Sequence, residues 1–305
     1  MQLLWSGWTG YVAGLSISIT PLTDPDYRPF SRRIAWLASD SDGNPVGSAF
    51  LRLNSKESLA HLSELELAVH PTERRRGIGS ELLAVAAAAG REHEVRTILA
   101  DATVESPGDH FLRSRGFTVG LTLIFARLSL SEASPAALSP AAPPGYRLES
   151  WSGVVSDELV ETYADARTAM DDAPVGDISY GPEIWDVDRV RHVAKVVEDR
   201  GEHLLTVSAI EQATGKIVGF TELVVPADGK GDAQHYGTAV LPEHRGHGLS
   251  LWMKADCIRR TRSAYPDLAG LLTDTVDTNA PMQRINTALG YQETHRTHRY
   301  TLDLE

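Results

Sequence analysis

Two long stretches of the chain share one succession of hydrophobic and polar patterns. In the first stretch, short apolar runs with strand-like alternation precede an Ala- and Leu-rich helical run, and a strand, a short helix and a closing strand follow. The predicted strands are residues 33–39, 46–53, 62–69, 97–103 and 118–128, and the predicted helices are residues 77–93 and 109–115. This stretch therefore predicts a unit that mixes strands and helices.

The second stretch repeats this order behind two additional helices at residues 158–170 and 184–200. The later predicted strands are residues 203–210, 217–225, 234–241, 271–276 and 298–304, and the later helices are 249–264 and 280–289. Most of residues 1–30 is expected to be extended or irregular. The first stretch therefore has little room for equivalents of the two additional helices.

A segment rich in proline and alanine separates the two stretches. Residues 131–145 contain four prolines among small side chains, a composition typical of a linker. We expect an N-terminal domain over residues 1–130, a linker over 131–145 and a C-terminal domain over 146–305. The total of 305 residues fits a prior of about 150 residues per domain.

Composition and charge argue against several classes of protein. Hydrophobic residues make up 42% and charged residues 23%, which indicates a globular chain, and a net charge of −12 argues against a general nucleic-acid binder. The single cysteine, Cys257, excludes a disulfide framework, and no Cys/His cluster has zinc spacing, so no metal is expected. The start of the chain lacks a basic region ahead of a long apolar run, and no run approaches the ~20 apolar residues of a membrane span. We therefore expect a cytoplasmic protein without a membrane partner.

The clearest repetition lies where a strand passes into a helix. The sequence LELAVHPTERRRGIGSELL begins at Leu65, and GTAVLPEHRGHGLSLWMK begins at Gly237. Aligned on Val-x-Pro, the matched pairs are Arg74 with Arg245, Gly77 with Gly248, Gly79 with Ser250 and, further on, Gly116-Phe117 with Gly290-Tyr291. Several matches in the same order predict two copies of one fold.

Glycines at such a junction let the backbone turn tightly and present successive N–H groups. These donors add to the positive end of the helix dipole and form a site for a diphosphate. The spacing differs from the Gly-x-Gly-x-x-Gly of dinucleotide-binding folds and from the Gly-Lys-Ser/Thr ending of P-loops. A plain strand-to-helix turn is the alternative for either copy alone, and the repetition argues against it.

Residues 65–117 and 234–291 strongly resemble motifs A and B of the GNAT superfamily, the Gcn5-related acyl-CoA N-acyltransferases, in a tandem arrangement over most of the chain. The resemblance implies an α/β fold of the α+β type, with two domains that each have a mixed, mostly antiparallel sheet and flanking helices. It also implies that acetyl-CoA or another acyl-CoA binds where a strand separates from its neighbour. The binding residues implied are Val69, Arg74, Arg75, Arg76, Gly77, Ile78, Gly79 and Ser80 in the first half, and Ala239, Val240, Arg245, Gly246, His247, Gly248, Leu249, Ser250 and Asn279 in the second.

Acyl transfer to an amine needs a base for the ammonium proton and often an acid for the leaving thiolate. In many GNATs a Glu on the separated strand is the base and a Tyr before the Gly-aromatic pair is the acid. Ser63 and Gln234 occupy the Glu position in the two halves, and Leu112 and Asn286 occupy the Tyr position. The chain therefore departs from the family pattern at both positions.

The second half is the predicted catalyst, and the first half is expected to be a degenerate copy that either holds CoA without catalysis or serves as a scaffold. The second half retains Asn279, where the first half has Glu105, and it has two helices where the family builds the acceptor pocket. His235 titrates near neutrality and is a candidate for accepting the ammonium proton. Asp232 is a further candidate base, and Tyr236 is a neighbouring candidate on the opposite face of the strand. Structural roles for His235 and Tyr236 are the alternative.

Acidic side chains near the additional helices favour a cationic acceptor. The candidates are Asp171, Asp172, Asp177 and Glu222, and a solvated acidic loop is the alternative. We expect acetyl transfer from acetyl-CoA to a primary amine of a small molecule, such as an amino sugar, a polyamine or an antibiotic-type compound of secondary metabolism. Direct attack is expected, because Cys257 lies within a predicted helix and does not suggest a nucleophile.

Two other interpretations stay open at this stage. GNAT-fold enzymes also draw acyl groups from aminoacyl-tRNA or carrier proteins, although the net charge of −12 argues against RNA. A non-catalytic acyl-CoA sensor or scaffold is the second alternative, because both halves lack the usual Glu and Tyr.

Overall fold

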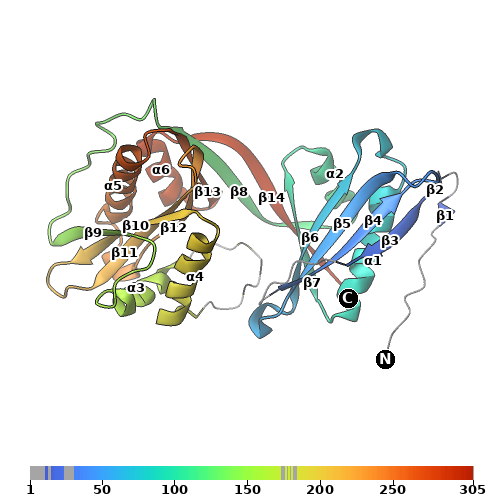
Figure 1. The fold of residues 1–305 in the computed structure, drawn as a ribbon, viewed down its shortest axis with the longest axis horizontal. Helices are drawn as coiled ribbons and strands as arrows, with labels where there is room; N and C mark the ends of the chain where they lie inside the picture. The colour runs from blue at the N-terminus through green and yellow to red at the C-terminus, as the bar shows by residue number, and fades with distance from the viewer. Residues whose placement is uncertain are drawn as a thin grey trace. The chain divides into compact units, whose positions relative to one another are not determined.

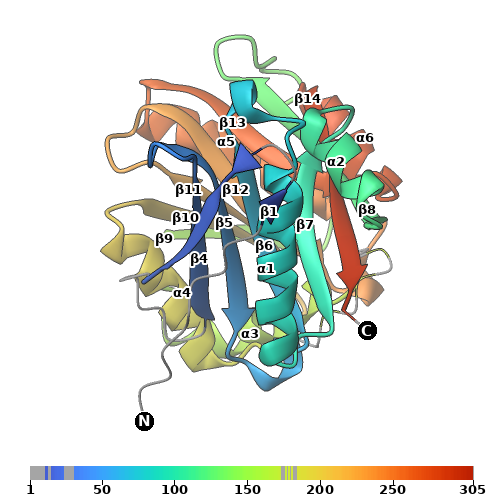
Figure 2. The ribbon, with the colours of Figure 1, turned by 90° about the vertical axis from the view of Figure 1, so that its right-hand side faces the viewer.

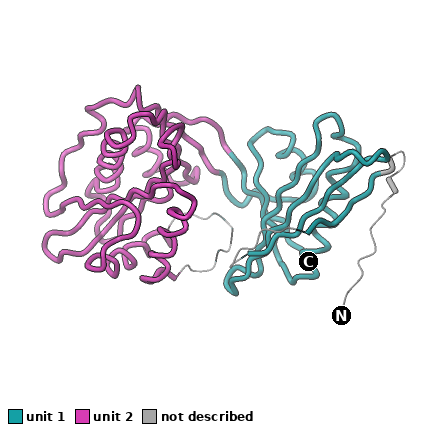
Figure 3. Tube along the Cα trace, viewed as in Figure 1, with its two compact units in different colours: residues 1–122, 176–181, 297–305 teal, residues 123–175, 182–296 magenta. Residues whose placement is uncertain are grey.

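The computed structural model describes residues 11–12, 15–23, 31–172, 176, 178, 180 and 184–304. It divides the chain into two compact units, shown in Figure 3. Unit 1 comprises residues 1–122, 176–181 and 297–305, and unit 2 comprises residues 123–175 and 182–296. These units differ from the contiguous domains expected with boundaries at residues 130 and 146.

Unit 1 is built on a mixed sheet in which neighbouring strands follow the order β3-β4-β5-β6-β7-β14. The strands are β3 (Ser18–Leu22), β4 (Ser31–Ser39), β5 (Pro45–Asn54), β6 (Leu62–Val69), β7 (Thr97–Thr103) and the end of β14 (Gln292–Asp303). The pairing is antiparallel throughout, except between β6 and β7. Two short strands, β1 (Tyr11–Val12) and β2 (Leu15–Ser16), form a separate hairpin.

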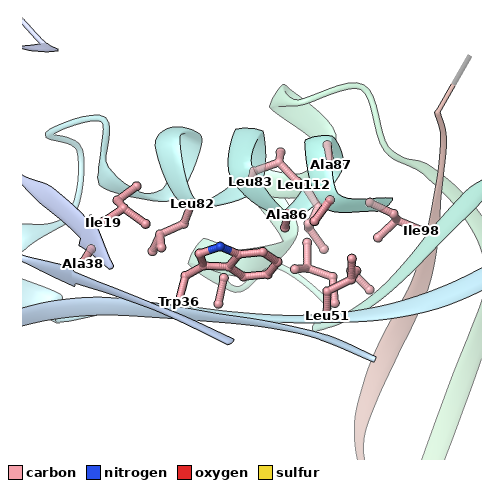
Figure 4. Packing of buried hydrophobic residues seen from close by; sticks show 14 of the residues in the cluster. Ile19, Trp36, Ala38, Leu51, Leu82, Leu83, Ala86, Ala87, Ile98 and Leu112 are labelled. Carbon is pink, nitrogen blue, oxygen red and sulfur yellow. The ribbon is translucent and has the colours of Figure 1, made fainter. Parts of the chain in front are cut away.

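Helices α1 (Ile78–Glu92) and α2 (Pro107–Ser114) contribute to one hydrophobic core with this sheet. Helix α1 packs on β5 and β6, as Figure 2 shows. The Trp36 side chain lies between the sheet and α1, close to Leu51 and Leu82 (Figure 4). Burial of such large apolar side chains, at roughly 25 cal/mol per Å², is the main stabilisation of this layer.

Unit 2 repeats the same arrangement, with strands in the order β9-β10-β11-β12-β13-β8 (Figure 1). The strands are β9 (Tyr146–Ser152), β10 (His203–Glu211), β11 (Ile217–Val225), β12 (Gly231–Val240), β13 (Leu268–Val276) and the end of β8 (Thr118–Ser129). Here too a single pair, β12 with β13, is parallel among the pairs of the described residues. The internal repeat predicted from the sequence is therefore confirmed.

Helices cover both faces of the sheet in unit 2. They are α3 (Val160–Arg167), α4 (Val187–Asp199), α5 (Leu249–Ala264) and α6 (Ala280–Leu289). Leu223 and Val225 of β11 lie in the core cluster with α5, whereas Phe220 packs with α3 and Val224 with α4. This explains why β11 is buried at every position and reads as an almost continuous apolar run.

Each sheet is completed by a strand from the other half of the sequence. In unit 2, residues 123–129 of β8 pair with β13, and in unit 1, residues 297–303 of β14 pair with β7. The strand at 118–128, expected to close the first half, therefore belongs largely to unit 2. The exchange was not predicted, because the order of elements along each half of the sequence is the same whichever sheet its last strand joins.

The positions of the other elements agree closely with the sequence prediction, apart from the last strand, which begins six residues earlier than expected, at Gln292, and three further differences. The expected linker is packed rather than free, since Leu138 is buried in the core of unit 2. Strand β9, directly after it, was not predicted. The helix expected over 158–170 is shorter and ends in a 3-10 turn at Thr168–Met170. None of the helices in the described part of the chain is long and apolar enough to cross a membrane.

Candidate functional site

Strands β12 and β13 separate partway along their length. Their parallel pairing runs from Gly231 with Leu268 to Gln234 with Leu272 and then stops. Beyond that point β13 continues to pair with β8, while β12 continues to pair with β11. The facing edges of the two strands beyond Gln234 and Leu272 therefore leave a gap in the sheet.

The turn after β12 continues this gap toward α5. A 3-10 turn at Pro242–His244 leads through Gly246 and Gly248, which have φ of +80° and +79°, into the first residue of α5, Leu249. Only glycine adopts such backbone angles without strain. Gly248 is the N-cap and offers no side-chain hydrogen bond, so the first N–H groups of α5 remain directed at a ligand site.

Arg245 holds this turn in place. Its Nε donates a hydrogen bond of 2.9 Å to the carbonyl oxygen of Val240, the last residue of β12. Its Nη2 also lies 2.8 Å from Asp172 Oδ2. The guanidinium therefore links the strand end, the turn and the segment that follows α3.

A cavity of about 1070 Å³ occupies the gap. Its walls come from β12 between His235 and Val240, from the turn and first helical residues of α5, from the end of β13 and from α6. Of the residues expected in the second half to bind acyl-CoA, those at the cavity are Ala239, Val240, Arg245, Gly246, Gly248, Leu249, Ser250 and Asn279. His247 does not line the cavity, and its Nδ1 lies 3.1 Å from the carbonyl oxygen of His244.

Asn279 also has a structural role. Its Oδ1 accepts a hydrogen bond of 3.2 Å from the backbone N–H of Met282 and caps the start of α6. In unit 1, Ser106 caps α2 in the same way. The first half has Glu105 at the position that corresponds to Asn279, and the capping side chain lies one residue later.

His235 lies where β12 and β13 separate. It is buried and lines the cavity, and its Nε2 lies 2.8 Å from the hydroxyl of Tyr291. Burial, together with the nearby charge of Lys254, lowers the pKa of His235 well below 6.5. The imidazole is therefore neutral at physiological pH and able to accept a proton.

Tyr236 and Asp232 have different surroundings from His235. Tyr236 forms a bulge opposite Glu222, is 45% exposed at the cavity, and accepts a hydrogen bond of 2.7 Å from Arg200. Asp232 does not line the cavity, because Arg127 of β8 engages both of its oxygens at 2.8 and 2.9 Å. The structure thus brings His235 and Tyr236, but not Asp232, to the cavity.

The acidic residues expected to bind the acceptor are dispersed. Asp172 lines the cavity, whereas Asp171 does not, and Asp177 lies outside the described residues. Glu222 is buried away from the cavity, where it accepts hydrogen bonds from Tyr163 at 2.5 Å and Arg167 at 2.6 Å. A buried carboxylate paired in this way supports the packing of α3 on β11 and is not available to a ligand.

Sequence reasoning missed a polar pair in this region. Lys254 of α5 is buried and lines the cavity, and its Nζ donates a hydrogen bond of 2.9 Å to Oδ1 of Asn286 on α6. Burial lowers the pKa of Lys254 to about 8. A lysine on the apolar face of a predicted helix was the available signal. Within the described residues, no group of three or more His, Cys, Asp or Glu side chains is arranged to hold a metal ion.

Unit 1 has an equivalent junction between strand β6 and helix α1, but a side chain lies against the start of the helix. Strands β6 and β7 separate after Glu64 and Leu99, and Arg74 Nε donates to the carbonyl oxygen of Val69 at 3.2 Å. A Cβ on Gly79 would lie 3.2 Å from the ring of Phe111, which therefore rests on the first turn of α1.

The remaining residues expected to bind acyl-CoA in the first half are turn and core residues. Gly77 caps α1 with φ of +88°, Arg75 has φ of +66°, and Arg76 forms an ion pair with Glu73. Ile78 is buried in the core of unit 1. The backbone N–H of Ser80 donates to the carbonyl oxygen of Gly77.

Comparison with known proteins agrees with this architecture. The family model described as the acetyltransferase (GNAT) domain matches residues 31–119, the half expected to be degenerate. The chain is 30% identical over 246 residues to a mycothiol acetyltransferase of Tsukamurella paurometabola, an alignment that covers 76% of this chain and 75% of that protein.

Solved structures show the same tandem fold. A tandem GNAT protein from the clavulanic acid biosynthesis pathway aligns with a TM-score of 0.73 and 25% identity, over 92% of this chain and 85% of that one. A GCN5-related N-acetyltransferase from Sphaerobacter thermophilus shares the fold, with a TM-score of 0.66 and 18% identity over 89% and 81% of the two chains. This chain therefore belongs to the GNAT superfamily of acetyltransferases, as a tandem member whose fold implies an acyl-CoA donor.

Proposed function

We propose that the protein transfers an acetyl group from acetyl-CoA to a primary amine of a small molecule, and that unit 2 carries the reaction. The observation that supports this most directly is the cavity of about 1070 Å³ between the separated strands. It extends from the N-terminus of α5, suited to a pyrophosphate, to His235, where a base is needed. A cavity of this size fits an extended ligand such as acyl-CoA with an acceptor beside it.

In this proposal different residues of unit 2 bind the donor, accept the proton and contact the acceptor. The N–H groups at Gly246, Gly248 and the start of α5 bind the pyrophosphate, and the unpaired edge of β12 binds the rest of the donor. Neutral His235 accepts a proton from the ammonium group of the acceptor, which frees the nitrogen lone pair for direct attack on the thioester carbonyl. Tyr236 contributes to the wall at which the acceptor enters.

The acceptor would enter from the side of α3. Met170 of the 3-10 turn lines the cavity and lies close to Gly237, where an added Cβ would be 3.6 Å from the Met170 sulfur. Asp172 and Asp274 are the carboxylates that line the cavity in the described residues, and Asp172 is paired with Arg245. Arg245, Lys254 and Arg284 line the cavity as well, so a small amine such as an amino sugar or a polyamine would be held at an individual carboxylate and not by an overall negative field. The named relatives include a mycothiol acetyltransferase and a tandem GNAT protein from the clavulanic acid biosynthesis pathway, which supports a small-molecule acceptor.

The test combines calorimetry with turnover. Acetyl-CoA should bind to the purified chain, and incubation with a panel of amino sugars, polyamines and aminoglycosides should release CoA only when an amine is present. Mass spectrometry should find one acetyl group on the amine. Binding without turnover across the panel would favour an acyl-CoA sensor, and strongly salt-dependent activity with aminoacyl-tRNA but not with acetyl-CoA would favour an RNA-borne donor. Either result would contradict the proposal.

A further inference from the structure

Lys254 is a buried cation in a part of the fold that does not need one. Its side chain is 1% exposed, yet it lines the cavity. Taking an ammonium group out of water costs several kcal/mol unless partners replace the lost hydration. Its Nζ contacts a neutral amide, that of Asn286, at 2.9 Å and lies 5.2 Å from the ring centroid of Tyr291.

The internal repeat provides a direct comparison. Lys254 lies six residues after Gly248, and the residue six after Gly77 in unit 1 is Leu83. Asn286 lies four residues before Gly290, and the residue four before Gly116 is Leu112. Leu83 and Leu112 are both buried in the core of unit 1 and are labelled in Figure 4. The equivalent positions of unit 1 are therefore both apolar and buried, so the packing of these helices does not by itself require the charged side chain of unit 2.

The surroundings of Lys254 connect it with the point where the strands separate. The groups that act on it electrostatically come from three elements: His235 on β12, Asp274 on β13 and Cys257 on α5 itself. His235 and Asp274 line the same cavity. Burial and the Cys257 side chain raise the pKa of Tyr291 well above 10, and burial raises that of Cys257 to about 12, so both remain neutral at physiological pH.

We propose that Lys254 is the acid that protonates the leaving thiolate of CoA, with Asn286 as the residue that positions its ammonium group. The inference rests on the proposed function. The acceptor ammonium first gives one proton to His235, which passes it to solvent. The neutral nitrogen then forms a bond to the acyl carbon and gives its second proton to His235, the bond from that carbon to sulfur breaks, and sulfur takes a proton from Lys254. Solvent then returns a proton to Lys254 and removes one from His235. The pKa of about 8 keeps Lys254 mostly protonated at neutral pH and still able to donate.

The experiment measures the thiol of bound CoA, so it needs no knowledge of the acceptor. CoA is titrated between pH 6 and 10 on the complete chain, and the thiolate is followed by its ultraviolet absorbance, for the unsubstituted protein and for Lys254→Met. The ammonium group should lower the pKa of the bound thiol by about 1 unit or more relative to free CoA, and Lys254→Met should abolish that shift. In the amine assay, kcat should fall about 10²-fold or more, with little change in the KM for acetyl-CoA.

Two further variants keep the result interpretable. Lys195→Met removes an exposed lysine of α4 that is paired with Glu198 and Asp199, and it should leave the thiol titration unchanged. The double variant Lys254→Leu/Asn286→Leu places leucine at both positions, as unit 1 does with Leu83 and Leu112, so it should fold and bind CoA even if Lys254→Met does not. Equal thiol pKa values in the unsubstituted protein and in a folded Lys254 variant would overturn this inference alone. Absence of CoA binding by the unsubstituted protein would overturn the proposed function and this inference with it.

Discussion

Arg245 donates a hydrogen bond from Nε to the carbonyl oxygen of Val240 at 2.9 Å, and this contact closes the turn between β12 and α5. Arg74 makes the same contact with Val69 in unit 1, at 3.2 Å. The arginine that stands out in the repeated motif therefore shapes the backbone of the turn. In unit 2 the same arginine also places a positive charge at the cavity.

Arg245→Gln should weaken acetyl-CoA binding. The variant loses a charged hydrogen bond that holds the turn, a contact of about 1.5–3 kcal/mol, so the dissociation constant should rise about 10-fold or more. Asp172→Asn removes the exposed ion pair with Arg245 and leaves the bond to Val240, so it should change affinity less than about 5-fold. Calorimetry on both variants checks this, and equal effects would show that the turn does not depend on the Val240 contact.

A side chain at Gly248, in the turn before α5, should weaken acetyl-CoA binding. Gly248 has φ of +79°, which costs a β-branched residue about 1–2 kcal/mol or more, so Gly248→Val should distort the turn and lower acetyl-CoA affinity at least 10-fold. Gly215, in the hairpin between β10 and β11, has φ of +72° and open space at Cβ. Gly215→Val should therefore cause similar strain without changing the affinity.

The position of Phe111 on Gly79 leads us to expect that unit 1 does not bind CoA. The aromatic ring occupies the first turn of α1, which a pyrophosphate would need. Native mass spectrometry should then find one CoA per chain, and Gly77→Val, the counterpart of Gly248→Val, should leave CoA affinity unchanged. A stoichiometry of two would show that the ring moves aside for a ligand.

His235 should make the reaction tolerant of mild acid. Because burial and the Lys254 charge hold the pKa of His235 well below 6.5, the imidazole stays neutral and able to accept a proton at pH 6.5. The acid limb of kcat/KM should therefore lie well below pH 6.5, and Lys254→Met should move it to higher pH by removing the neighbouring charge. His235→Asn should lose about 10²-fold or more in kcat. An acid limb at or above pH 6.5 would count against His235 as the base.

Asp109 should make the stability of unit 1 sensitive to acid. Burial opposes the charge of Asp109, but hydrogen bonds from Tyr300 and His298 outweigh it and lower the pKa of the carboxyl to about 2. A folded-state pKa below the usual 3.8 means that this stabilisation is complete above about pH 4 and is lost as the pH falls through 2.

Asp109→Asn should lower the free energy of unfolding at pH 7 by about 1–3 kcal/mol, because α2 loses its bonds to β14. Urea unfolding at pH 7 and pH 3 measures both effects, and the variant should show less dependence on acid than the unsubstituted protein. Arg296→Gln, which removes an exposed pair with Glu293, is a suitable control. Equal acid dependence of Asp109→Asn and the unsubstituted protein would contradict the assignment.

The sequence by itself determined most of the helices and strands, the internal repeat, and the strand-to-helix junction that is the predicted ligand site in each half. These features depend on short-range patterns: alternation in strands, helical spacing, and glycines at turn positions with positive φ, which other residues adopt only with strain. His235 was identified for the same reason, since its place on the critical strand is a matter of counting from Val240.

Only the tertiary structure decided which strand completes which sheet and which side chains meet at the cavity. Strands β8 and β14 each follow the last helix of their half of the sequence, so only the path of the whole chain shows which sheet each strand joins. Lys254 bonds to Asn286, which is 32 residues away in the sequence. Arg127 bonds to Asp232, which is 105 residues away and does not line the cavity. Contacts of this kind join residues that no local pattern relates, because their distance in space is set by the packing of several elements at once.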